Sequence, residues 1–148
     1  MTTGNEGRVE VRRTFSHPAK RLFDAWTDEE GMRAWMRPGP TEDVRVQLDV
    51  RVGGAYTIEM IFGDESIVHT GRYTVVDRPR RLAFTWDAEH FDEPTTVTLD
   101  FVPTTEGTEV VLVHEGLPSE ESAKRHVGGW QTILEELASE LDAEPSRS

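Results

Sequence analysis

The sequence predicts an α+β domain in which a curved antiparallel sheet wraps around one long C-terminal helix. Over residues 119–142, apolar residues recur every three or four positions, which is typical of a helix with one apolar face. Over residues 43–115 they alternate with polar residues, which is typical of strands with one buried face. Such a sheet has one apolar face to cover, and the C-terminal helix is the only predicted element long and apolar enough to cover it.

The N-terminal part of the chain predicts one strand and two short helices. Residues 8–15 alternate between apolar and polar side chains, which indicates a strand. Pro18 suits the first turn of a helix, and Thr27 and Glu30 have the spacing of a capping box for a second helix. We expect that second helix to end at the Pro-Gly-Pro sequence of residues 38–40.

Six antiparallel strands are predicted to follow in a meander with hairpin turns. Alternation runs unbroken from Val44 to Val52, so we expect the first of these strands to reach the turn at Gly53 and Gly54. In the strand predicted over residues 67–76 both faces carry apolar residues, so alternation leaves open which face points toward the helix.

The long helix has a well-marked start and an unusual interior. Ser119 can cap its first amides, and Glu120 and Glu121 place negative charge at the positive end of the helix dipole. Gly128 and Gly129 each cost about 1 kcal/mol relative to alanine inside a helix. We therefore expect either a close approach of another element at this pair, or a helix that breaks or begins there.

Composition limits the classes of function that fit. The 148 residues are expected to form a single domain, ordered from about residue 8 to 142, with residues 1–7 and 143–148 frayed. The formal charge of −12 disfavours nucleic acid and anionic membrane surfaces as partners. No signal peptide or membrane-spanning segment is visible, which favours a cytoplasmic location.

Few residues suggest catalytic or metal chemistry. The chain has no cysteine, and its five histidines never occur in a paired metal-ligand spacing, so we expect neither a metal site nor a cofactor. His114 shares the strand face of Val110 and Leu112, and should therefore point toward the helix. A buried imidazole there could orient a ligand or transfer a proton, or it could simply be a hydrogen-bonded histidine of the core.

Several short segments occur in the order seen in a known family. They lie at residues 13–18, 22–28, 52–56, 71–73, 77–79, 82–86, 97–99, 112–116 and 129–130, and Trp35 is a further matching position. The chain resembles the branch of the START-related (SRPBCC) superfamily named for the activator of heat-shock protein 90 ATPase homologue. That resemblance implies the helix-grip fold. The family often has a proline where Glu29 stands and a second aromatic residue where Met36 stands, so the short helices could differ locally.

The resemblance also implies an elongated, mostly apolar cavity between the sheet and the long helix. We therefore predict binding of a small hydrophobic molecule, such as a lipid, a polyketide or an aromatic compound. Tyr56 and Tyr73 could supply a hydroxyl that orients it, although a purely structural role is the simpler interpretation of both. Trp86 and Trp130 could form an aromatic wall or belong to ordinary core. The predicted lining residues are Ile58, Met60, Phe62, Tyr73, Phe84, Trp86, Leu99, His114, Trp130 and Leu134.

Two alternatives remain open at this point. The branch name suggests an interaction module that stimulates a chaperone ATPase, with a role in the stress response. Other members of the superfamily are cyclases or hydrolases, in which case His114 would act as general base, but a role without catalysis is favoured. A monomer or a weak homodimer is expected, because no residue requires an oligomer.

Overall fold

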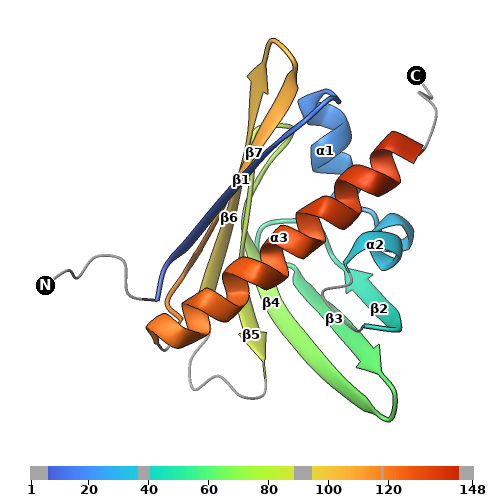
Figure 1. Cartoon of the computed structure of the whole chain (residues 1–148), viewed down its shortest axis with the longest axis vertical. Coiled ribbons are helices and arrows are strands. Elements are labelled where there is room, and N and C mark those ends of the chain that lie inside the picture. The colour runs from blue at the N-terminus through green and yellow to red at the C-terminus, as the bar shows by residue number, and fades with distance from the viewer. Residues whose placement is uncertain (1–6, 37–40, 89–94, 118, 144–148) are drawn as a thin grey trace, which may run out of the picture.

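A computed structural model describes residues 7–36, 41–88, 95–117 and 119–143 (Figure 1). Within these residues the chain forms one seven-stranded antiparallel sheet and three helices, in the predicted order of strand, two short helices, six strands and a long helix. The strand order is β1-β7-β6-β5-β4-β3-β2. The elements are β1 (Val9–Phe15), α1 (Ala19–Ala25), α2 (Glu29–Trp35), β2 (Asp43–Leu48), β3 (Ala55–Phe62), β4 (Glu65–Asp77), β5 (Arg81–Ala88), β6 (Thr95–Thr104), β7 (Gly107–Glu115) and α3 (Glu120–Ala143).

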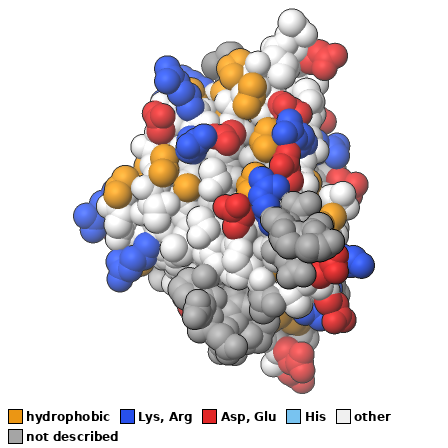
Figure 2. Space-filling view, turned by 90° about the vertical axis from the view of Figure 1, so that its left-hand side faces the viewer, with side chains coloured by type: hydrophobic (Ala, Val, Ile, Leu, Met, Phe, Trp, Pro, Cys, Tyr) orange, Lys and Arg blue, Asp and Glu red, His pale blue; other side chains and the backbone are white. Residues whose placement is uncertain are grey.

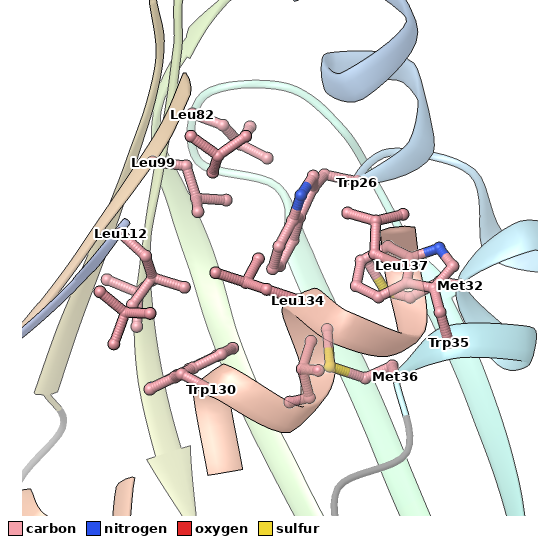
Figure 3. Close-up of a cluster of buried hydrophobic side chains, with 14 of the residues drawn as sticks. Trp26, Met32, Trp35, Met36, Leu82, Leu99, Leu112, Trp130, Leu134 and Leu137 are labelled. Carbon is pink, nitrogen blue, oxygen red and sulfur yellow. The ribbon is translucent and has the colours of Figure 1, made fainter. Parts of the chain in front are cut away.

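The long helix α3 crosses one face of the sheet, and α1 and α2 lie on that same side (Figure 1). The α3 side chains that face the sheet are buried, namely Trp130, Ile133, Leu134, Leu137, Ala138 and Leu141. Figure 3 shows part of the core that results, with Trp26, Trp35 and Met36 near α3 and Leu82, Leu99 and Leu112 projecting from the sheet. The predicted α+β helix-grip architecture is confirmed.

The register of β4 explains why its inward face could not be predicted. His69 and Tyr73 are buried and point inward at odd positions, but the pairing with β5 shifts between Tyr73 and Val75. After this bulge Val76 is opposite Leu82, so the even positions face the core. In this one strand, the side chains that point inward therefore lie at odd positions before the bulge and at even positions after it.

The helix α3 begins as predicted, but the structure at its glycine pair differs from the prediction. The Ser119 hydroxyl accepts a hydrogen bond from the Ser122 amide at 3.0 Å, which confirms the N-cap. The helix runs unbroken through Gly128 and Gly129, and a Cβ atom built on either glycine would meet no atom of the described residues within 4 Å. The expectations of a helix break and of a close approach at this pair were both wrong.

Two local predictions near the short helices and β2 were also wrong. The hydroxyl of Thr27 turns back to donate to the Phe23 carbonyl at 3.1 Å, so it caps no amide of α2, and Asp28 occupies the N-cap position without a side-chain bond. The strand β2 ends at Leu48, and Val52 is 66% exposed, because the chain turns at Gly53, whose φ is 87°.

The ends of the elements differ from prediction by a few residues. Pro18 precedes α1 rather than lying in its first turn, and its carbonyl accepts the amide of Leu22 at 3.2 Å. Ala143, expected to be frayed, is the last residue of α3. The predicted helix stop at residues 38–40 lies outside the described residues.

Side chains of α2 cover the outer edge of β2. The Arg33 guanidinium donates to the Val44 carbonyl at 3.1 Å, and the Leu48 amide donates to a Glu29 carboxylate oxygen at 2.8 Å. These bonds occupy backbone groups that could otherwise pair with a strand of another chain. None of the helices in the described part of the chain is long and apolar enough to cross a membrane.

Candidate ligand-binding cavity

A small cavity lies between α2 and the face of the sheet that α3 covers. The volume open to the centre of a water-sized sphere is about 10 Å³. That is room for about one water molecule. The lining residues are Trp26, Met32, Met36, Leu48, Tyr56, Ile58, Tyr73, Phe84 and Trp86.

The cavity includes some of the residues predicted from the sequence and not others. Ile58, Tyr73, Phe84 and Trp86 line it. The rings of His114 and Trp130 lie behind Trp86, with centroids 6.3 and 5.1 Å from its ring. The remaining predicted residues do not line this cavity: Met60, Leu99 and Leu134 are buried elsewhere in the core, and Phe62 is half-buried.

Sequence reasoning missed the wall contributed by the short helices. Trp26, Met32 and Met36 lie on the apolar sides of these helices, but an apolar stripe does not distinguish a cavity wall from ordinary packing. Met36 stands where the family often has an aromatic residue, which is the one signal in the sequence that sets this position apart.

The floor of the cavity is a cluster of aromatic rings on three neighbouring strands. Tyr56 on β3 lies 5.6 Å from Tyr73 on β4 and 5.4 Å from Phe84 on β5, measured between ring centroids. Trp86 stacks on His69 at 4.4 Å. These separations are typical of favourable aromatic pairs, so the floor is preformed.

The Tyr56 hydroxyl is already used within the protein. It donates to the Thr85 carbonyl at 2.5 Å, and burial raises the pKa of this hydroxyl. The ring has room because residue 71 is glycine, where a Cβ atom would lie 2.6 Å from a Tyr56 ring carbon. Burial also raises the pKa of Tyr73, so both tyrosines are neutral at physiological pH.

His114 is fully buried, and both of its ring nitrogens are hydrogen bonded. The Thr95 hydroxyl donates to the Trp86 carbonyl at 2.7 Å, so it accepts from Nε2–H of His114, 2.6 Å away. On the other side of the ring, the indole N–H of Trp130 donates to Nδ1 at 3.0 Å. Burial, with smaller contributions from His126 and His69, lowers the pKa of His114 to about 3.

This arrangement fixes the imidazole as a neutral Nε2–H tautomer. Its one lone pair is occupied by the Trp130 indole, so no lone pair is available to take a proton from a substrate. The geometry therefore matches a hydrogen-bonded core histidine better than a general base.

Two other indoles differ from Trp130. The Nε1 atoms of Trp26 and Trp86 are buried, and neither has a hydrogen-bond acceptor among the described residues. Within the same residues, no group of three or more His, Asp or Glu side chains is placed to hold a metal ion.

A curved antiparallel sheet that packs one face against a long C-terminal helix defines a helix-grip domain. The family described as "Activator of Hsp90 ATPase homolog 1-like protein" matches residues 16–142, and the chain belongs to this family.

Solved structures of proteins from several bacteria share the fold. Protein CV1439 from Chromobacterium violaceum is 23% identical, with a TM-score of 0.84 over 93% of this chain and 99% of that one. The AHSA1 protein SPO3351 from Silicibacter pomeroyi is 26% identical, with a TM-score of 0.78 over 91% and 97%. Protein MLL2253 from Mesorhizobium loti is 25% identical, with a TM-score of 0.79 over 94% and 99%. No curated protein sequence matches the chain.

Proposed function

We propose that this protein binds a small hydrophobic molecule in the cavity between the sheet and the helices. The observation that carries the proposal is the wall of that cavity, in which nine apolar or aromatic side chains from α2, the end of α1 and four strands converge, and none of these described residues is charged. Apolar ligands gain about 25 cal/mol for each Å² of surface removed from water, so such a wall favours them.

The cavity must enlarge before it can hold a ligand. Binding sites for small molecules usually measure roughly 300–1,000 Å³, whereas this cavity measures about 10 Å³. Met32 and Met36 are the side chains best suited to move, because methionine is unbranched and fills irregular spaces in several rotamers. We propose that the ligand takes the space that these two side chains fill.

Native mass spectrometry and thermal unfolding test the proposal. The purified protein is examined for a co-purifying mass and then against fatty acids, sterols and aromatic polyketides. A ligand at one hundred times its Kd should stabilise the fold by about 2.7 kcal/mol and raise the unfolding midpoint. The same native spectra give the oligomeric state.

A matched pair of variants locates the site. Met36→Trp should fill the cavity and abolish the stabilisation, whereas Met36→Leu, of similar volume, should retain it. Binding that is unchanged in Met36→Trp, or the absence of binding by every compound in the wild type, would contradict the proposal.

The chaperone alternative rests on the family description alone. Among the described residues the exposed large hydrophobic side chains are Val52, between β2 and β3, and Val102 on β6. On the face in Figure 2, hydrophobic side chains are scattered among charged ones rather than gathered in one patch. Stimulation of a chaperone ATPase by the purified protein, with no ligand bound in the tests above, would favour this alternative.

A further inference from the structure

Two buried hydrogen-bond donors in the cavity wall bear on the chemistry of the ligand. Trp26 is 1% exposed and Trp86 is 3% exposed, and the Nε1 atom of each lacks an acceptor among the described residues. A buried N–H group without an acceptor is unfavourable and is rare in native proteins. Trp130, which packs between these two indoles at 6.4 and 5.1 Å, has its own N–H bonded to His114.

The other residues of the wall do not compensate for these donors. Neither the Tyr56 nor the Tyr73 hydroxyl accepts a hydrogen bond from these indoles, and no described residue in the wall is charged. Among the described residues of this wall, a carboxylate ligand would find no cation and an ammonium ligand no anion, so either would be buried unpaired at high cost. A neutral oxygen acceptor, by contrast, would accept a hydrogen bond from an indole N–H that lacks an acceptor among the described residues.

We propose that the ligand is a neutral, mainly apolar molecule that carries a carbonyl or a similar oxygen, and that this oxygen accepts a hydrogen bond from the indole N–H of Trp26 or Trp86. This inference rests on the proposed function. It adds the charge of the ligand and the polar group by which the ligand is oriented.

A pair of probe compounds with the same ring skeleton tests the inference. Fluorenone and fluorene are planar and nearly equal in size, and fluorenone alone carries a carbonyl oxygen. Their Kd values are measured by titration followed in ¹H–¹⁵N spectra of the protein. One added hydrogen bond should make fluorenone bind about tenfold more tightly.

The spectra also identify the donor. The chain has four tryptophans, and each gives one indole cross-peak that a Trp→Phe variant assigns. Fluorenone should move the peak of Trp26 or Trp86 downfield relative to fluorene. The Trp130 peak serves as an internal reference, because its N–H already donates to His114.

Variants complete the test. Trp26→Phe or Trp86→Phe should abolish the difference in Kd between fluorenone and fluorene. Trp35→Phe is the control, because Trp35 packs on Trp26 at 4.7 Å but does not line the cavity. Equal affinities in the wild type, as expected if a buried water satisfies the donors, would overturn the inference and leave the proposed function intact. Binding of neither compound would count against both.

Discussion

Trp130 of α3 and His114 of β7 are joined by a hydrogen bond inside the core, with 3.0 Å between Nε1 and Nδ1. The bond belongs to a longer chain, since His114 donates to the Thr95 hydroxyl, which donates to the Trp86 carbonyl. Every donor in this chain has one acceptor. The network therefore ties the long helix to β5, β6 and β7 in a single arrangement.

We expect the hydroxyl group of Thr95 to contribute more to the stability of the fold than its methyl group does. Thr95→Val keeps the volume but leaves Nε2–H of His114 and the Trp86 carbonyl without this partner, which should destabilise the fold by about 2–3 kcal/mol. Thr95→Ser retains the hydroxyl and should cost about 1 kcal/mol for the lost methyl group. Urea unfolding measures both free energies, and equal losses in the two variants would show that the hydrogen bonds contribute little.

Stability should fall as the solution becomes acidic, in part because of His114. Its pKa is lowered to about 3 in the folded state, whereas an unfolded histidine titrates near pH 6.5. Between these values the unfolded chain binds the proton and the folded chain does not. The contribution of His114 is therefore fully present above pH 6.5 and decreases by about 1.4 kcal/mol for each pH unit below it.

His114→Gln isolates this contribution, because glutamine cannot titrate yet can both donate and accept. At pH 7.5 the variant should be less stable than the wild type. The difference in stability should shrink as pH falls from 6.5 to 4.5, because only the wild type loses the contribution of His114. The carboxylates titrate in both proteins, so their effect cancels in the difference. A difference that stays constant over this range would contradict the low pKa of His114.

Replacement of glycine by alanine should have opposite effects at two places in the fold. At Gly71 the new Cβ would lie 2.0 Å from the Thr85 carbonyl oxygen and 2.6 Å from the Tyr56 ring, so we expect a clash. We expect Gly71→Ala to cost about 3 kcal/mol or more, at the upper end of the cost of overpacking a core. At Gly128 and Gly129 a new Cβ would have no neighbour within 4 Å in the described part of the chain, and the backbone is helical.

Gly128→Ala and Gly129→Ala should each stabilise the protein by about 1 kcal/mol, the difference in helix propensity. Thermal and urea unfolding of the three variants check the signs. Destabilisation by alanine at position 128 or 129 would show that the pair serves a purpose that packing does not reveal.

The N-cap of α3 should contribute a measurable amount. Ser119→Ala removes the acceptor of the Ser122 amide and should cost about 1 kcal/mol. Ser119→Asp is the control, because aspartate can accept the same bond and also interacts favourably with the helix dipole. Loss of stability in both variants would show that Ser119 does not stabilise the protein through this N-cap hydrogen bond.

The sequence was most informative where one residue pattern determines one structure. Alternation along β7 correctly placed His114 inside the core, and the period of α3 correctly placed Trp130 against the sheet. The partners of His114 could not be predicted, because Thr95 and Trp130 come from other elements and meet it only after the sheet and helix have packed.

Other features were hidden because tertiary structure overrides the local pattern. The bulge after Tyr73 in β4 shifts the parity within one strand, and residues 73–75 contain no glycine or proline that would mark the shift in the sequence. The place of Met36 in the cavity wall depends on how α2 docks on the sheet. Because this docking is a long-range interaction, it cannot be predicted from the amphipathic pattern of the seven residues of α2.

The first strand and the last helix are fastened to each other at both ends. Gly7, before β1, accepts the amide of Leu117, just before α3, at 3.0 Å, and His17, after β1, lies 2.8 Å from the Asp142 carboxylate near the end of α3. Each of these contacts joins segments more than a hundred residues apart. A nascent chain that has already made all seven strands would still expose the apolar face of its sheet, until the ribosome supplied the helix that covers it.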